Sequence, residues 1–226
     1  MVSRFNPNRR QFLAGSASLC GLAVAGCSTT TDELPLNPAR PQVSRTYALM
    51  YGPVPGERFP IPAVDLNRVP EKYYRRQVNY FGPEAPGTIV VNTRQFYLYL
   101  VQEDRSAMRY GVGLGRAGFE WSGRARVGWK QVWPKWTPPA EMIRRQPELE
   151  RWSADNGGMP PGLDNPLGAR ALYIFQGKVD TLYRIHGSPE YWTIGKAVSS
   201  GCVRMMNQDI IDLYSRVPTH SQILVV

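Results

Sequence analysis

Apolar and polar positions along the chain change in pattern near residue 88. Residues 27–87 hold no long periodic run and are interrupted by prolines, as in LPLNPARPQ and FGPEAPG. Proline at this density disfavours helices and central strands and favours extended connections. Beyond residue 88, short runs rich in β-branched and aromatic residues alternate with turn residues, which is typical of strands. We therefore predict a mainly β domain over 88–226, preceded by a Pro-rich extension over 27–87.

The β domain is expected to contain many short strands and one or two short helices. One helix should begin with Thr137 as N-cap and Pro138 at the first helical position, and another should span 207–217 and end at Pro218. The strands that we expect are 88–93, 95–102, 107–115, one or two within 125–136, 169–176, 181–187 and 221–226. This pattern predicts a β-sandwich-like or part-barrel sheet.

The Pro-rich extension carries too many large apolar side chains for a free tether. We expect it to pack in part on the β domain, with a short helix near 70–77. The apolar residues concerned are Tyr47, Met50, Tyr51, Phe59, Ile61, Tyr73, Tyr74, Tyr80 and Phe81.

The first 26 residues have the composition of an export signal. A cationic start is followed by an uncharged segment rich in Ala, Gly and Ser, which is a poor candidate for a membrane-spanning helix. NRRQFL (8–13) resembles a twin-arginine signal, although Asn8 stands where Ser or Thr is usual, so Sec export is the alternative. We predict a signal peptide over 1–26.

Cys27 lies at the end of this segment, in the sequence VAGCS, which resembles a bacterial lipobox. In lipoproteins with this motif, cleavage precedes the cysteine and its sulfur takes a diacylglycerol. Cys27 is therefore the predicted lipid attachment site, and Ser28 after it favours sorting to the outer membrane. The alternative is ordinary signal cleavage that leaves a soluble protein.

The formal charge of +9 suits an anionic polymer or a membrane surface. Loss of residues 1–26 removes three arginines and no acidic residue, which lowers the net charge to +6. Because the basic residues form no long run, a solvated basic surface is the simplest interpretation, and we expect no nucleic-acid partner. Two histidines and three cysteines without C-x-x-C or H-E-x-x-H spacing predict no metal site, and no cofactor is expected.

Cys202 becomes the only thiol of the mature chain if Cys27 is lipidated, because Cys20 is lost with the signal. It cannot then form an internal disulfide in an oxidising compartment. A cysteine nucleophile needs a base and an oxyanion site made of backbone N–H groups. SSGC (199–202) supplies small residues around the thiol, and His186, which we place at the end of a strand, is the candidate base. His220 is expected to be a turn histidine. On residue types alone, a structural role for this Cys and His is the more common outcome.

HGS (186–188) followed by SSGCVRM (199–205) resembles the signature of the L,D-transpeptidase (YkuD) family, whose pattern is His-Gly, a spacer, and Ser/Thr-x-Gly-Cys-hydrophobic-Arg. The likeness extends over 88–226, since TIVVNTRQFYLYLV resembles the family's opening hairpin and DNPLGARALYI its middle part. Ser200 departs from the histidine found in many members. The resemblance implies the family's mainly β, sandwich-like domain.

The resemblance also implies a role for each residue of the motif. Cys202 would attack the carbonyl between meso-diaminopimelate and D-Ala of a peptidoglycan stem peptide and form a thioester, while His186 would transfer protons. The Gly187 carbonyl would orient His186, and the N–H groups of Gly201 and Cys202 would form the oxyanion hole. Ser200 and Arg204 would support the loop or the substrate, with a structural ion pair as the alternative for Arg204. Trp133 and Trp136 either line the acceptor cleft or belong to the core.

The predicted function is therefore a cysteine-dependent L,D-transpeptidase of the cell envelope, in the periplasm and anchored to the outer membrane through Cys27. Its partners would be stem peptides as donor and acceptor, or an outer-membrane protein amine as acceptor. A carboxypeptidase or hydrolase acting on the same bond would use the same residues. A non-catalytic lipoprotein that tethers the outer membrane to peptidoglycan is the alternative from another class.

Overall fold

The computed structural model describes residues 43–115, 122–199 and 202–226. The signal peptide and Cys27 lie outside these residues, as do Ser200 and Gly201. The extension carries α1 (Arg45–Met50), η1 (Leu66–Arg68), η2 (Glu71–Tyr73) and β1 (Arg76–Asn79). The remaining elements are β2 (Ile89–Asn92), β3 (Tyr97–Val101), β4 (Ser106–Gly111), β5 (Gly113–Gly115), β6 (Gly123–Val132), α3 (Ala140–Arg145), η3 (Pro147–Trp152), β7 (Arg170–Gln176), β8 (Val179–Ser188), η4 (Tyr191–Thr193), β9 (Ala197–Ser199), β10 (Val203–Met206), α4 (Asn207–Arg216) and β11 (Gln222–Val225).

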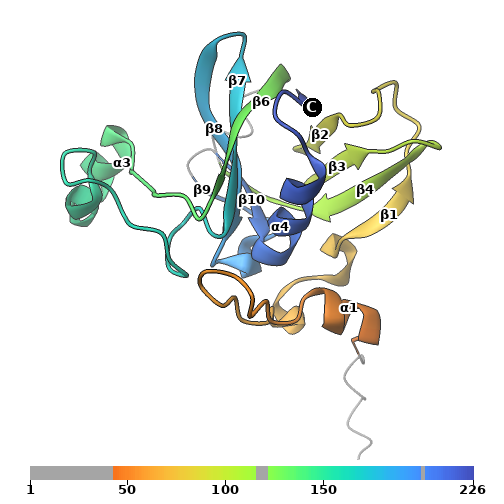
Figure 1. The fold of residues 1–226 in the computed structure, drawn as a ribbon, viewed down its shortest axis with the longest axis horizontal. Helices are drawn as coiled ribbons and strands as arrows, with labels where there is room; N and C mark the ends of the chain where they lie inside the picture. The colour runs from red at the N-terminus through yellow and green to blue at the C-terminus, as the bar shows by residue number, and fades with distance from the viewer. Residues whose placement is uncertain (1–42, 116–121, 200–201) are drawn as a thin grey trace, which may run out of the picture. The chain divides into compact units, whose positions relative to one another are not determined.

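The strands of the described residues join into one 11-stranded sheet in the order β1-β4-β3-β2-β11-β6-β7-β8-β10-β5-β9. The β8–β10, β2–β11 and β5–β9 pairs are parallel, and the other neighbours are antiparallel. Helix α4 lies beside β7, β8 and β10 (Figure 1). The mainly β fold class predicted from the sequence is confirmed.

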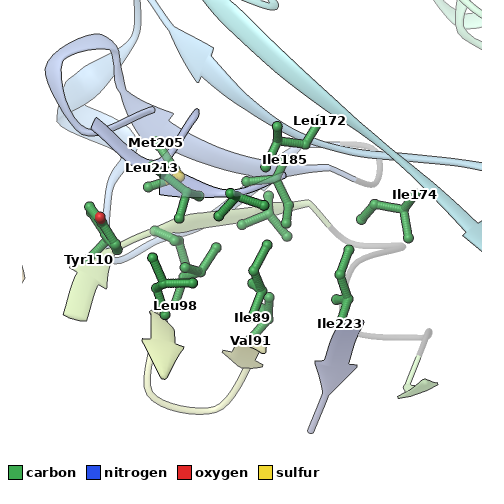
Figure 2. Packing of buried hydrophobic residues seen from close by; sticks show 14 of the residues in the cluster. Ile89, Val91, Leu98, Tyr110, Leu172, Ile174, Ile185, Met205, Leu213 and Ile223 are labelled. Carbon is green, nitrogen blue, oxygen red and sulfur yellow. The ribbon is translucent and has the colours of Figure 1, made fainter. Parts of the chain in front are cut away.

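The main core forms where the two halves of this sheet face each other and α4. Apolar side chains of β2, β3 and β4 meet those of β7, β8, β10 and β11 (Figure 2). Leu213 and Ile210 of α4 complete the cluster and are fully buried. In these strands, Ile, Leu, Val and Met stand at alternate positions or in continuous runs. Burial of the apolar faces therefore fixes the register of the strands.

The expected strands at 88–93, 95–102, 169–176 and 221–226 correspond to β2, β3, β7 and β11. The run 107–115 divides into β4 and β5, and 125–136 contains one long strand, β6. The short strands β1, β9 and β10 were not predicted. Each has three or four residues, so pairing with a neighbour decides its conformation more than local propensity does.

Two helix predictions were wrong in detail. The first helix begins at Ala140 rather than after Thr137, and Pro139 precedes it without a side-chain cap. A residue before proline is driven out of the helical region, so Pro138 cannot start a helix in front of Pro139. In the extension, the expected helix at 70–77 is a single turn, η2, because Arg76–Asn79 pair with β4 as an edge strand.

The described part of the extension packs through two apolar clusters. Tyr51, Tyr73 and Tyr74 are buried with Ile194 and Met206. Ile61 packs with Trp133 and Ala169, where Glu57 accepts hydrogen bonds from the Trp133 indole and the Arg170 guanidinium. Of the helices in the described ranges, none is both long and apolar enough to cross a membrane.

Candidate active site

His186 and Cys202 are brought together by the parallel pairing of β8 with β10. Arg204 is directly opposite His186, and Val203 is opposite Ile185. Cys202 immediately precedes β10, and its carbonyl accepts a hydrogen bond of 3.1 Å from the Gly115 N–H of β5. Since side chains alternate between faces, Cys202, Arg204 and His186 all project from the same face of the sheet.

His186 lies within β8 and not at its end, which corrects the sequence-based placement. β10 continues the pairing past Gly187 to Ser188, and so extends the strand. The side chain is buried, with 3% of its surface exposed. The imidazole is therefore fixed by strand geometry rather than carried on a flexible turn.

The His186 ring is oriented by backbone carbonyls. Nδ1 lies 2.5 Å from the carbonyl oxygen of Gly187, and the Pro166 carbonyl also faces the ring. Because a carbonyl only accepts, Nδ1 carries the proton in the neutral ring and the lone pair lies on Nε2. Burial lowers the pKa of His186 to about 4, with the Gly187 carbonyl acting in the opposite direction. The ring is therefore neutral at pH 7 and able to accept a proton.

Gly187 allows α4 and the 157–168 loop to approach this part of β8. A Cβ at this position would overlap Asn207 Oδ1 and Ile210 Cγ2 of α4. Gly168 has φ +60, and a Cβ there would overlap Asn207 Oδ1 and the Gly187 backbone. Asn207 Oδ1 accepts a hydrogen bond from the Ala169 N–H at 3.0 Å. Because neither glycine has a side chain, α4 and the loop pack directly against the Gly187 backbone, and this packing holds the carbonyl that orients His186.

Asn165 organises the loop that carries Pro166. It is fully buried, and its amide donates to the carbonyls of Pro134 and Pro160 at 3.1 and 3.0 Å. Its Oδ1 accepts from the Leu167 N–H at 2.9 Å. This network holds the Pro166 carbonyl in place against the imidazole, a role that sequence reasoning missed.

Cys202 is half-buried and forms no disulfide. Burial raises the pKa of its thiol, because the thiolate loses hydration. The backbone N–H of Arg184 and the charges of Arg184 and Arg204 act in the opposite direction on that pKa. The thiol is thus influenced by two arginines and lies on the same face as a neutral imidazole.

Arg204 forms an ion pair with Glu190, with Nη1 2.6 Å from Oε2. Of the two roles considered from the sequence, the ion pair is present in the structure. The Glu190 side chain is half exposed, so a substrate carboxylate can compete for Arg204.

Three other residues considered from the sequence have clear positions. Trp133 is 2% exposed and packs edge-on against Phe59, so it belongs to the core and not to a cleft. Trp136 is half-buried and pairs through its backbone with Met159. His220 is exposed and has φ +70, as expected of a turn histidine.

Sequence reasoning missed Arg184, whose charge acts on the thiol, and Asp180, which pairs with Arg184. Arg184 stands two positions before His186 in β8, so its side chain shares the face of the imidazole. The sequence therefore contained enough information to predict the position of Arg184. It did not contain enough to predict that of Asp180, because the contact between Asp180 and Arg184 depends on a local distortion of β8.

Across the three described stretches, no group of three or more His, Cys, Asp or Glu side chains is placed to hold a metal ion. What the site contains is a thiol, a neutral imidazole on the same sheet face with a fixed proton on Nδ1, and flanking cations. Such a set can carry out acyl transfer through a thioester.

The chain is similar to known proteins. The family described as L,D-transpeptidase catalytic domain matches residues 86–225. The Probable L,D-transpeptidase ErfK/SrfK of Escherichia coli (strain K12) is 34% identical over 143 residues, which are 61% of this chain and 43% of that protein. The Putative L,D-transpeptidase YqjB of Bacillus subtilis (strain 168) is 39% identical over 141 residues, 61% of this chain and 69% of that protein. The chain thus spans less than half of the Escherichia coli relative.

Among solved structures, a Brucella melitensis protein described as a probable carnitine operon oxidoreductase aligns with 68% of this chain and 94% of its own, at 43% identity. The TM-score is 0.49. At that score, the likeness carries no conclusion about fold or function.

Proposed function

Because the chain belongs to the L,D-transpeptidase (YkuD) catalytic domain family, we propose that it is a peptidoglycan L,D-transpeptidase that uses Cys202 as its nucleophile. The observation that carries the proposal is the hydrogen bond from His186 Nδ1 to the Gly187 carbonyl, on the strand beside Cys202. It fixes the tautomer whose Nε2 can take the thiol proton.

In the proposed acylation, Cys202 Sγ attacks the carbonyl that joins the L-centre of meso-diaminopimelate to D-Ala. The C–S bond forms while His186 Nε2 takes the thiol proton. The C–N bond to D-Ala then breaks, and the same proton passes from Nε2 to the leaving amine. The ring is neutral before the step because burial depresses its pKa to about 4; as an imidazolium it is a strong acid toward the leaving amine.

In the second half-reaction, an acceptor amine attacks the thioester and His186 removes its proton. A new C–N bond forms, the C–S bond breaks, and the proton passes from His186 Nε2 to Sγ, which restores the Cys202 thiol. N–H groups of Gly201 and Cys202 would stabilise the oxyanion in both halves. Ser200 and Arg204 would support this loop or bind a substrate carboxylate.

The setting of the enzyme is part of the proposal. Residues 1–26 would direct export by the twin-arginine or the Sec route, and Cys27 would carry a lipid anchor in the outer membrane. Residues 27–87 would form an arm, and 88–226 the catalytic domain in the periplasm. The described arm residues pack on aromatic clusters, which supports an ordered arm rather than a free tether.

The test is a product assay with a purified stem tetrapeptide, with and without an added amine acceptor. We expect D-Ala release and a new amide product from the wild type, and neither from Cys202→Ala. D-Ala release without any transfer product would make the protein a hydrolase. A folded wild type that releases no D-Ala would contradict the proposal and favour a non-catalytic tether.

A further inference from the structure

Arg184 and Asp180 form an ion pair that a regular strand does not permit. Arg184 Nη1 and Nη2 lie 2.7 and 2.9 Å from the two carboxylate oxygens of Asp180. Residues four apart in a strand are separated by about 13 Å. The pairing of β8 with β7 shows how this distance is shortened. Tyr173 is opposite Arg184, and Phe175 is opposite Asp180. Two residues of advance along β7 therefore correspond to four along β8. A bulge in β8 therefore brings the carboxylate to the guanidinium.

The bulge is centred on a strained residue. Leu182 has φ +61, in the left-handed region that a branched side chain disfavours, and 74% of its surface is exposed. Its N–H donates to Asp180 Oδ1 at 2.8 Å, so the same carboxylate holds both the bulge and Arg184. The strained backbone positions a charged pair next to the site, which is where such strain commonly has a function.

Arg184 is fixed on its other side by aromatic rings. Its guanidinium lies 4.2 Å from the ring centroid of Tyr173, and Tyr173 stacks on Trp129 with 3.6 Å between centroids. Only 13% of the Arg184 side chain is exposed. A planar guanidinium held by a carboxylate and a ring has little freedom to move. Arg184 is therefore a fixed positive charge.

This fixed charge lies beside Cys202. Val203 is opposite Ile185, so Cys202 comes next to Arg184 on the neighbouring strand, on the face shared with His186. Arg204 is the second cation that acts on the thiol, and the carboxylates paired with the two arginines are Asp180 and Glu190. Arg204 contacts a half-exposed Glu190 through one nitrogen, which makes it the less rigid of the two cations.

We propose that Arg184, held by Asp180, Tyr173 and the bulge at Leu182, is a positioning residue that stabilises the thiolate of Cys202. The inference rests on the proposed role of Cys202 as nucleophile. Thiolate is the reactive form of cysteine, and a fixed cation beside it offsets part of the cost of burying it. The direction of the effect agrees with the opposing influences of burial and Arg184 on the pKa of the thiol.

The test measures how fast Cys202 in the full chain is alkylated by iodoacetamide between pH 6 and 10, by mass spectrometry of the peptide that contains Cys202. We expect alkylation of Arg184→Gln to be about three- to tenfold slower at pH 7, with its profile displaced to higher pH. Arg184→Lys, which keeps the charge without the planar fork, should fall between. The double variant Asp180→Asn with Arg184→Gln keeps the net charge and should be as slow as Arg184→Gln.

Arg126→Gln on β6 is the matched control, because it removes one arginine that contacts His220, the Gly177 carbonyl and the Phe175 ring and not the thiol cluster. It should match the wild type within about twofold. An Arg184→Gln profile equal to that of the wild type would overturn the proposal. If Arg184→Gln does not fold, the double variant with Asp180→Asn, which removes both charges of the pair, is measured in its place, and a wild-type profile in it overturns the proposal. Alkylation needs no stem peptide, so the two proposals are tested separately. Equal alkylation of Arg184→Gln and the wild type would overturn the role of Arg184 and leave the proposed function intact. Absence of D-Ala release by the wild type would overturn the proposed function without changing the alkylation profiles.

Discussion

Two clusters of charged and titratable side chains differ in what their polar groups bind, and the difference separates chemistry from stability. The thiol cluster consists of Arg184, His186, Cys202 and Arg204, on one face of β8 and β10. The α4 cluster consists of Tyr51, Arg75, Tyr110, Asp209 and Asp212, which join α4 to the extension and to β4. Each cluster combines arginine with buried titratable groups, yet only the thiol cluster places a thiol and a neutral imidazole on one face of neighbouring strands.

In the α4 cluster, the polar groups bind one another. The Tyr51 hydroxyl donates to Asp209 Oδ2 at 3.3 Å and accepts from the Arg75 N–H at 2.6 Å. Arg75 lies 3.1 Å from Asp212, which also accepts from the Tyr110 hydroxyl at 2.6 Å. This cluster joins the extension to α4 and holds no nucleophile. In the thiol cluster, the Gly187 carbonyl accepts from His186 Nδ1 instead, and the lone pair of the neutral ring therefore lies on Nε2.

Gly187 lies between the thiol cluster and helix α4. Its carbonyl binds His186 on one side, while its missing side chain admits Asn207 and Ile210 of α4 on the other. Damage to the α4 cluster should therefore lower stability first, and damage to the thiol cluster should lower activity first. Gly187 should affect both.

The largest effect should come from His186→Gln. Loss of the general base should slow D-Ala release by about 10²- to 10⁴-fold. The unfolding temperature should change little, because the glutamine amide can still donate to a carbonyl. Asp209→Asn is the comparison and should release D-Ala at a rate close to that of the wild type. Equal activity losses in the two variants would remove the distinction between the clusters.

Asp209 should make stability depend on pH. Burial raises its pKa to about 7, opposed by Arg75, while the unfolded value is 3.8. The folded state thus binds more protons between these values, so this contribution to stability is fully present below about pH 4 and is lost as pH rises through 7. Asp209→Asn should lack this loss, which amounts to about 2–4 kcal/mol.

The measurement is urea unfolding of both proteins at pH 5 and pH 8. The wild type should lose free energy of unfolding relative to Asp209→Asn at the higher pH. A difference between the proteins that is constant over this range would contradict the assignment of a buried, protonated Asp209.

Gly187→Ala should lower both stability and activity. The added methyl group would overlap Asn207 and Ile210, and overpacking of this kind costs about 1–3 kcal/mol. The shifted backbone would also move the carbonyl that orients His186. Gly56→Ala is the matched control, since nothing lies within 4 Å of its Cβ position. The thermal unfolding temperature and the rate of D-Ala release should both be lower for Gly187→Ala than for Gly56→Ala. Wild-type activity in a destabilised Gly187→Ala would contradict the dependence of His186 on the position of the Gly187 carbonyl.

Tyr51→Phe should have the smallest effect. It removes one hydroxyl with two hydrogen bonds in the α4 cluster, which should cost about 1–2 kcal/mol of unfolding free energy. D-Ala release by the folded variant should equal that of the wild type at 25 °C. A lower rate without loss of stability would mean that the extension influences the thiol cluster directly.

The sequence predicts the mainly β class because β2, β3, β7 and β11 have strong strand propensity of their own. It does not predict β1, which is a strand because β4 pairs with it, or β10, which pairs with both β8 and β5. The motif around Cys202 and His186 is local and readable. The bulge at Leu182 is a tertiary feature, so no periodicity in the sequence indicates that Asp180 contacts Arg184.

The most direct test of the central claim is peptide-level mass spectrometry of the protein quenched in acid during turnover of a stem tetrapeptide. We predict that the peptide containing Cys202 carries the tripeptide acyl group as a thioester that hydroxylamine removes. The adduct should accumulate on the wild type when no amine is present and should be absent from Cys202→Ala. An adduct on another residue, or D-Ala release by Cys202→Ala at the wild-type rate, would contradict the account.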